Sequence, residues 1–156
     1  MSFDDDFKTG RWFEEKWYKI LKPYIQDLVW VQVWEKRWDL YSENKNIGFE
    51  IKGDIVSQNT GRLVVEIEMP PGKPSALSTT KSKYWIFDTG REHFIVRSND
   101  LKELIKDHKP DIFTGRGDKE PKKAYRIGNK YISKIGISLE DMLYEINTPS
   151  GLDGFC

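Results

Sequence analysis

Cysteine, histidine and long apolar runs are scarce in this chain, and each scarcity excludes a class of protein. The 156 residues hold one cysteine, Cys156, so neither an internal disulfide nor a cysteine-based zinc site is expected. Only two histidines occur, His93 and His108, and no Ser/His/Asp or Cys/His arrangement stands out from chance. No apolar run approaches the roughly 20 residues of a membrane helix. With an acidic start unlike a signal peptide, these features predict an intracellular protein that binds no membrane.

A net charge is also absent, since 25 Lys and Arg residues balance 25 Asp and Glu residues. This balance argues against a general nucleic-acid binder. The charges are distributed unevenly, however: residues 1–69 hold ten basic and thirteen acidic residues, residues 70–134 hold fifteen and eight, and residues 135–156 hold none and four. An acidic cluster beside a basic stretch suits a metal site that faces a phosphate backbone. The alternative is that the charges are spread over solvated faces.

The residues that are present suit one globular domain. Hydrophobic residues make up 38% of the chain and charged residues 32%, and a chain of this length can bury one core without disulfides. We expect a single domain over residues 1–146 and a flexible tail over residues 147–156.

A helix is predicted from Gly10 to Tyr24. Its apolar residues recur at helical spacing and define a buried stripe: Phe13, Trp17, Ile20, Leu21 and Tyr24. Glu14 lies at the edge of this stripe, where a carboxylate needs a partner. That partner is a metal ion, a lysine or solvent.

Asp39 is followed after ten residues by Glu50-Ile51-Lys52, an acid and then an acid-x-lysine triplet. Strand alternation puts Trp38 and Leu40 on one face and Asp39 on the other. In the next strand, Glu50 and Lys52 point away from the apolar side. Carboxylates are the ligands that Mg²⁺ prefers, and an ammonium group beside them can orient the attacking water. The spacing therefore predicts a metal-dependent hydrolytic site.

A second arrangement uses the same polar faces. Asp54 is followed after eleven residues by Glu66-Ile67-Glu68. We expect these acids to lie near the first set, because neighbouring strands are roughly 4.8 Å apart. Carboxylates placed side by side repel unless a cation neutralises them. Asp54, Glu66 and Glu68 are thus an alternative metal set, or supports for the first one; a solvated sheet face is the remaining possibility.

These residues resemble the PD-(D/E)XK nuclease superfamily. The similar segments, in order, are Gly10 to Leu21 with Glu14, Trp38-Asp39-Leu40, Phe49 to Asp54, Asn59-Thr60-Gly61, Gly72 to Leu77 and Thr80 to Phe87. The order is similar to that of small endonucleases of phages and other viruses, including junction-resolvase-like members. The resemblance implies an α/β fold with a restriction-endonuclease-like core, in which a central mixed β-sheet is flanked by helices. It also implies a nuclease that acts in the cytoplasm, which is the host's if the chain is virus-encoded.

By that resemblance, Asp39 and Glu50 would ligate Mg²⁺ or Mn²⁺, and the carbonyl of Ile51 would be a further ligand. Lys52 would be the catalytic lysine, and Glu14 a further catalytic acid. The implied partners are nucleic acid, with DNA favoured over RNA, and a second copy of the chain in a homodimer. A nuclease fold that has lost cleavage and binds nucleic acid or a partner is the alternative, although the complete acid-acid-lysine set favours an enzyme.

The chain departs from the family pattern at four positions. Trp38 replaces the proline that names the motif, and Ala76 stands where related sequences have glycine. Ser82 and Lys83 stand where they have alanine and aspartate. The substrate contacts of this loop are therefore expected to differ.

Basic and hydroxyl-bearing residues after the acidic strands are candidate nucleic-acid contacts. They are Lys73, Ser75, Thr80, Lys81 and Lys83 in one segment, and Lys122, Lys123 and Arg126 at the end of the polar segment 108–123 and beyond it. Ammonium and hydroxyl groups suit phosphate oxygens. Both segments also fit ordinary polar loops.

The rest of the pattern predicts short elements. A hairpin is expected from Tyr84 to Arg97, a helix from Ser98 or Asn99 to Asp107, a second hairpin around Gly128-Asn129, and a helix beginning at Ser138. Trp30 and Trp34 share strand parity and are candidates for an exposed self-association surface.

Overall fold

Strand β6 (Tyr84–Asp88) lies at the centre of the fold, and all five of its residues are buried. It belongs to a five-stranded sheet with the order β1-β2-β3-β6-β7. The other members are β1 (Val29–Trp30), β2 (Leu40–Ser42), β3 (Ile47–Gly53) and β7 (His93–Arg97). β3 and β6 run parallel and the other neighbours antiparallel, so the sheet is mixed, as expected. The computed structural model describes residues 3–32, 38–69, 73–74, 76–108, 111–113 and 122–148.

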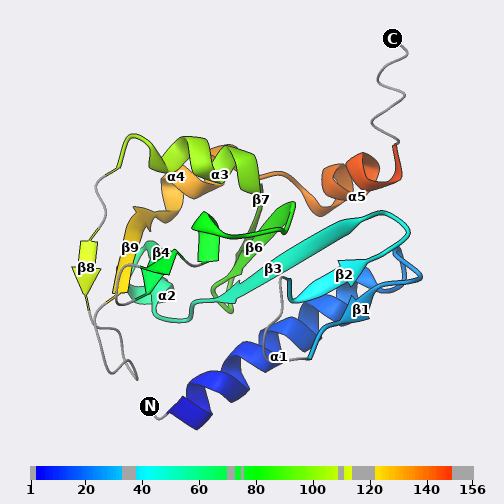
Figure 1. Cartoon of the computed structure of the whole chain (residues 1–156), viewed down its shortest axis with the longest axis horizontal. Helices are drawn as coiled ribbons and strands as arrows, with labels where there is room; N and C mark the ends of the chain where they lie inside the picture. The colour runs from blue at the N-terminus through cyan, green and yellow to red at the C-terminus, as the bar shows by residue number, and fades with distance from the viewer. Residues whose placement is uncertain are drawn as a thin grey trace.

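The two faces of this central sheet contribute to two separate hydrophobic cores. Helices α1 (Phe3–Leu21) and α5 (Leu139–Asn147) pack on the face that buries Tyr84 and Ile86. Helices α3 (Ser98–Ile105) and α4 (Asn129–Ile135) contribute to the core that contains Trp85 and Phe87 (Figure 1). Successive side chains of a strand point to opposite faces, so β6 supplies both cores.

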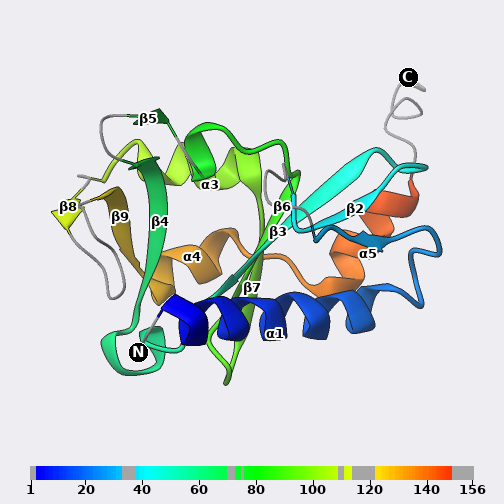
Figure 2. The ribbon, with the colours of Figure 1, turned by 60° about the horizontal axis from the view of Figure 1, so that its bottom comes forward.

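A second sheet, with the order β5-β4-β9-β8, lies at one end of the molecule (Figure 2). Its strands are β4 (Arg62–Met69), β5 (Lys73–Pro74), β8 (Asp111–Phe113) and β9 (Lys122–Gly128), and the short helices α2 (Ser57–Thr60) and η1 (Ala76–Ser78) flank β4 in sequence. Leu63, Val65 and Ile127 of this sheet enter the second core. The expectation that β4 lies beside β3 in one sheet is therefore wrong, because β4 pairs with β5 and β9.

Helix α1 begins before the predicted Gly10 and ends at Leu21, and Pro23 follows, which cannot continue a helix. Phe13, Trp17 and Leu21 are buried, as the stripe predicts. Tyr24 was expected in the stripe but is 57% exposed, because the helix has already ended there.

Buried Asp88, the last residue of β6, anchors α1 to the sheet. Its Oδ2 accepts hydrogen bonds from Lys16 Nζ at 2.7 Å and from Trp17 Nε1 at 2.8 Å. Its Oδ1 accepts one from the N–H of Gly90 at 2.8 Å. A buried carboxylate is retained only where such partners satisfy it.

The downstream expectations are confirmed in part. β6 and β7 form the predicted hairpin, and Ser138 caps α5 by accepting a hydrogen bond from Asp141 N at 2.9 Å. The prediction of a second hairpin around Gly128-Asn129 is wrong, since β9 ends at Gly128 and residues 129–135 form helix α4. Ile132 and Ile135 are three residues apart and lie on one side of α4, where they pack into the second core. The prediction of a strand here did not take this helical spacing into account.

Trp30 does not form an exposed surface. It is half-buried against the first core, and its Nε1 donates to Glu14 Oε1 at 3.0 Å. The prediction of a self-association surface through Trp30 is therefore wrong, and Trp34 lies outside the described residues.

Glu145 of α5 joins the helix to the sheet through two hydrogen-bond donors. It accepts from Tyr84 Oη at 2.7 Å and from Arg97 Nε at 3.1 Å, and it forms an ion pair with Arg97. Arg97 also pairs with Asp100 at 3.1 Å. The hydrogen bonds from Arg97 lower the pKa of Glu145, although partial burial opposes this.

Gly53→Ala should destabilise the protein, whereas Gly10→Ala should not. A Cβ on Gly53 would lie 1.9 Å from Phe13 Cδ2, while one on Gly10 meets nothing within 4 Å. We expect the first change to lower the free energy of unfolding by about 1–3 kcal/mol, and the second to raise it by up to about 1 kcal/mol, since alanine favours a helix. Urea denaturation measures both, and equal stability of the two variants would contradict the packing of α1 on β3.

Glu145→Gln should lower stability at neutral pH by about 1 kcal/mol, because the ion pair with Arg97 is partly exposed. Glu145 has a lowered pKa in the folded state, so its contribution is present above its ordinary pKa and is lost as the pH falls through the lowered value. The difference from the unaltered chain should therefore shrink between about pH 7 and about pH 3. Glu140→Gln, at an exposed position of α5, is the control. A pH-independent difference would refute the ion-pair explanation.

Candidate functional site

Asp39 lies in a bend immediately before β2 and is 4% exposed. Its Oδ2 accepts a hydrogen bond from Ile51 N at 2.7 Å, and its own N–H donates to Phe49 O at 2.9 Å. The carboxylate thus sits against the edge of β3, where β2 has not yet begun. The bend also interrupts the expected alternation of side chains between the two faces of the strand. The ring centroids of Trp38 and Tyr41 are 4.2 Å apart in a stacked pair, so Trp38 does not share the face of Leu40.

The carbonyl group of Ile51 leaves β3 on the same side as Asp39. In a strand, the N–H and C=O of one residue point to the same edge, and the N–H of Ile51 is bound to Asp39. The sequence-predicted ligand pair of Asp39 and the Ile51 carbonyl is therefore compatible with the backbone direction of β3.

Glu50 and Lys52 point to the same face of β3, as predicted. Lys52 Nζ lies 3.4 Å from Glu50 Oε2 and 5.6 Å from the ring centroid of Trp85. Trp85 is the direct neighbour of Glu50 in the parallel pairing of β3 with β6. The ammonium of Lys52 is thus held between a carboxylate and the face of an indole ring, which attracts cations.

Three carboxylates act on the charge of Lys52. Burial disfavours the ammonium, but the negative charges of Glu50, Asp39 and Glu66 outweigh it and raise the pKa of Lys52 above its ordinary value. Lys52 is therefore protonated at neutral pH. Lys52 thus lies within reach of the charges of three carboxylates at β3 and β4.

The alternative set of acids is divided between two environments. Asp54 follows β3, and its Oδ1 accepts from Ser57 N at 3.1 Å, which closes the turn into α2. The negative charge of Glu66, on β4, instead helps to raise the pKa of Lys52. The side chain of Glu68 lies outside the described residues. Of the alternative set, Glu66 is therefore the member whose charge acts at Lys52, while Asp54 closes the turn after β3.

Glu14 is held at the other side of β3. Its partner Trp30 belongs to the edge strand β1 and packs against the core that α1 covers. Glu50 and Lys52 point away from the Phe49 and Ile51 side chains of that core. Glu14 thus lies beside the edge strand β1, on the face of the sheet that α1 covers. Glu50 points to the opposite face.

The residues of the cluster fit Mg²⁺ or Mn²⁺. Among the described residues, no group of three or more His, Cys, Asp and Glu side chains is arranged to hold a metal ion. Mg²⁺ needs fewer, because it is commonly bound by one or two carboxylates together with waters and substrate phosphates. Asp39, Glu50 and the Ile51 carbonyl supply such hard oxygen donors.

The expected nucleic-acid contacts fall into separate groups. Thr80, Lys81 and Lys83 line a small cavity before β6. Lys123 and exposed Arg126 lie on β9 of the second sheet. For Lys73 and Lys122 the structure describes the backbone in β5 and β9 but not the side chain, and Ser75 lies outside the described residues. Sequence reasoning missed that Ser82, Ser98 and Lys102 line the same cavity.

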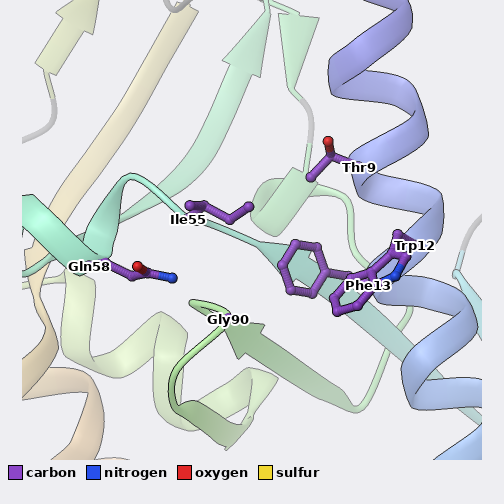
Figure 3. A pocket seen from close by; sticks show the side chains of 6 residues that line it. All are labelled: Thr9, Trp12, Phe13, Ile55, Gln58 and Gly90. Atoms are coloured by element: carbon purple, nitrogen blue, oxygen red, sulfur yellow. The ribbon is translucent and has the colours of Figure 1, made fainter.

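A larger cavity, of about 450 Å³, opens between α1 and the ends of the parallel strands β3 and β6 (Figure 3). Trp12 and Phe13 line it from α1, and Ile55, Gln58 and Gly90 from the facing turns. Its lining is mainly apolar and includes none of Asp39, Glu50 and Lys52. This cavity is therefore separate from the candidate metal site.

Asp39→Ala should destabilise the chain more than Asp39→Asn. Alanine leaves the buried N–H of Ile51 without its acceptor, at a cost of about 1–3 kcal/mol, whereas asparagine keeps an oxygen at that place. Urea denaturation in EDTA measures this difference without any metal contribution. If the two variants were equally unstable, the hydrogen bond to Ile51 would not be the structural role of Asp39.

Comparison with protein-family models, with curated proteins and with solved structures finds no match to this chain. Within the described ranges, no helix is both long and apolar enough to cross a membrane. The chemistry of the site is therefore inferred from the residues of this chain: Asp39, Glu50 and Lys52 gathered at β3, the central strand of a mixed sheet.

Proposed function

We propose that the chain is a metal-dependent endonuclease that hydrolyses phosphodiester bonds in nucleic acid, DNA in preference to RNA. One observation carries the proposal: Asp39, Glu50 and Lys52 converge at β3, and the charges of the carboxylates raise the pKa of Lys52. Their spacing in sequence leaves open whether these side chains meet. Their proximity at β3 supports the proposal that they act together as an acid-acid-lysine site.

Each residue has a distinct role in this proposal. Asp39, Glu50 and the Ile51 carbonyl would hold Mg²⁺ or Mn²⁺. The bound ion would polarise the phosphate and lower the pKa of a bound water. Lys52, as an ammonium, orients the attacking water and offsets the charge that builds on the phosphate oxygens. Glu66 helps to keep Lys52 protonated, and Glu14 stays a candidate for a further acid.

The alternative function is a nuclease-like protein that has lost cleavage and binds nucleic acid or a partner. The ion pair of Glu50 with Lys52 favours this alternative, because one carboxylate oxygen already has a cation within 3.4 Å. In an active enzyme, Glu50 would have to share its oxygens between Lys52 and the metal. Cleavage assays with Mg²⁺ or Mn²⁺ separate the two functions.

Lys52→Ala should abolish nicking of plasmid DNA and leave the fold intact. The side chain of Lys52 is 37% exposed, so its removal creates no closed cavity. Mn²⁺ should bind at least as well as before, because the variant removes a positive charge that repels the ion. Nicking is measured with Mn²⁺ and with EDTA, and metal binding by the shift of the melting temperature.

Lys45→Ala, in the exposed turn between β2 and β3, is the matched control and should cut normally. Full activity of Lys52→Ala would refute the assigned role. If the unaltered chain bound DNA but did not nick it with either metal, the binding protein would be the correct function. The homodimer expected from the resemblance is tested separately, by sedimentation at several protein concentrations.

A further inference from the structure

A small cavity of about 190 Å³ lies between the start of β6 and the start of α3. It is lined by residues 80–83, by residues 97–99 and by Lys102. Four of these lining residues are cationic, namely Lys81, Lys83, Arg97 and Lys102, and none is a carboxylate. The electrostatic field inside such a cavity favours an anion.

The hairpin of β6 and β7 brings the two halves of this cavity together. Tyr84 pairs with Arg97, and beyond this pair the N–H of Ser98 donates to Lys83 O at 2.8 Å. Ser98 Oγ also donates to the carbonyl of Ser82. The lining is therefore fixed by backbone contacts on both sides.

Ser82 has a buried hydroxyl that the protein leaves without a partner. The residue is 4% exposed and lines the cavity, and its Oγ makes no hydrogen bond within the described structure. A buried hydroxyl of this kind costs free energy unless it is satisfied. An acceptor oxygen that enters the cavity would satisfy it.

The N-terminus of α3 adds backbone donors to the same place: the N–H of Ser98 is taken by Lys83 O, which leaves the next amide groups of the first turn. Arg97 precedes the helix in an extended conformation and provides no side-chain cap. The first amide groups of a helix lack intrahelical acceptors and carry a partial positive charge, which suits phosphate. Arg97 itself is engaged by Glu145 and Asp100, so the lysines are the cations that can adjust to a ligand.

The cavity is connected to the candidate metal site by one side chain. Trp85 Nε1 donates to Thr80 Oγ1 at 3.2 Å at the cavity, and the same indole lies under the ammonium of Lys52. Ser82 lies three residues before Trp85 in the chain and precedes β6. One side chain, the indole of Trp85, therefore contacts both sites.

We propose that this cavity binds a phosphate group of the nucleic-acid strand that the metal site cuts. That the phosphate belongs to nucleic acid rests on the proposed function. That the cavity binds a phosphate at all rests on Ser82, Lys102 and the start of α3. The group is either a terminal monoester or an internal phosphodiester, and the two can be distinguished with labelled oligonucleotides.

The test measures binding in EDTA, so that cleavage plays no part. A fluorescent single-stranded oligonucleotide, with either a 5′-phosphate or a 5′-hydroxyl, is titrated with the unaltered chain, Ser82→Ala and Lys102→Gln. Lys106→Gln is the matched control, since Lys106 caps the C-terminal end of α3, pairs with Glu103 and does not line the cavity. Inorganic phosphate is added as a competitor.

We expect Lys102→Gln to weaken binding roughly tenfold and to lower the salt dependence by about one phosphate contact. Ser82→Ala should weaken binding roughly fivefold while its melting temperature is unchanged or higher, because an unsatisfied hydroxyl has been removed. If Ser82 had only a structural role, Ser82→Ala would lower the melting temperature and leave oligonucleotide binding unchanged. Tighter binding of the 5′-phosphate form identifies a terminal monoester, and equal binding of both forms identifies an internal phosphodiester.

Two results would overturn the proposal: binding by Ser82→Ala and Lys102→Gln equal to that of Lys106→Gln, or no competition by inorganic phosphate. Because EDTA removes the metal, normal phosphate binding in a chain that never cuts DNA would refute the nuclease and keep the cavity. Normal DNA cleavage, with no effect of either variant on binding, would refute phosphate binding in the cavity and leave the proposed nuclease function in place.

Discussion

The parallel pairing of β3 with β6 is the constraint on which the rest of the structure depends. Its register sets Glu50 beside Trp85 and Lys52 beside Phe87. Because β6 is buried on both faces, a shift by one residue would move the side chains of each hydrophobic core into the other, where they do not fit. The position of the acids and the lysine is therefore fixed by packing and not by their own interactions.

Within that frame, the charges of the site oppose its folding. Three carboxylates surround one ammonium, and Asp39 is buried. The hydrogen bond from Ile51 offsets part of the cost for Asp39, and the indole of Trp85 stabilises Lys52. These two contacts therefore compensate part of the cost of gathering the charged groups at β3.

The sequence predicts those parts of the fold that local spacing determines. The stripe of Phe13, Trp17 and Leu21 identifies α1, and the β6–β7 hairpin follows from two apolar runs around a turn. The spacing of Asp39 and Glu50-Ile51-Lys52 identifies the candidate site. Long-range pairing is not predictable in this way: Glu66 was expected beside β3, but the partners of β4 are β5 and β9, which sequence spacing does not specify.

The same limit explains why the cavity before α3 was only half visible in the sequence. Lys81 and Lys83 stand out as cations in a polar loop, but Ser82 looks ordinary until the fold buries it, and Lys102 looks like any exposed helical lysine. The hairpin register makes them neighbours. A cluster of carboxylates repels a polyanion, so the proposed nuclease would need separate positive charge to hold its substrate. In a chain with no net charge, the basic cavity at the far side of Trp85 would supply that charge without neutralising the acids.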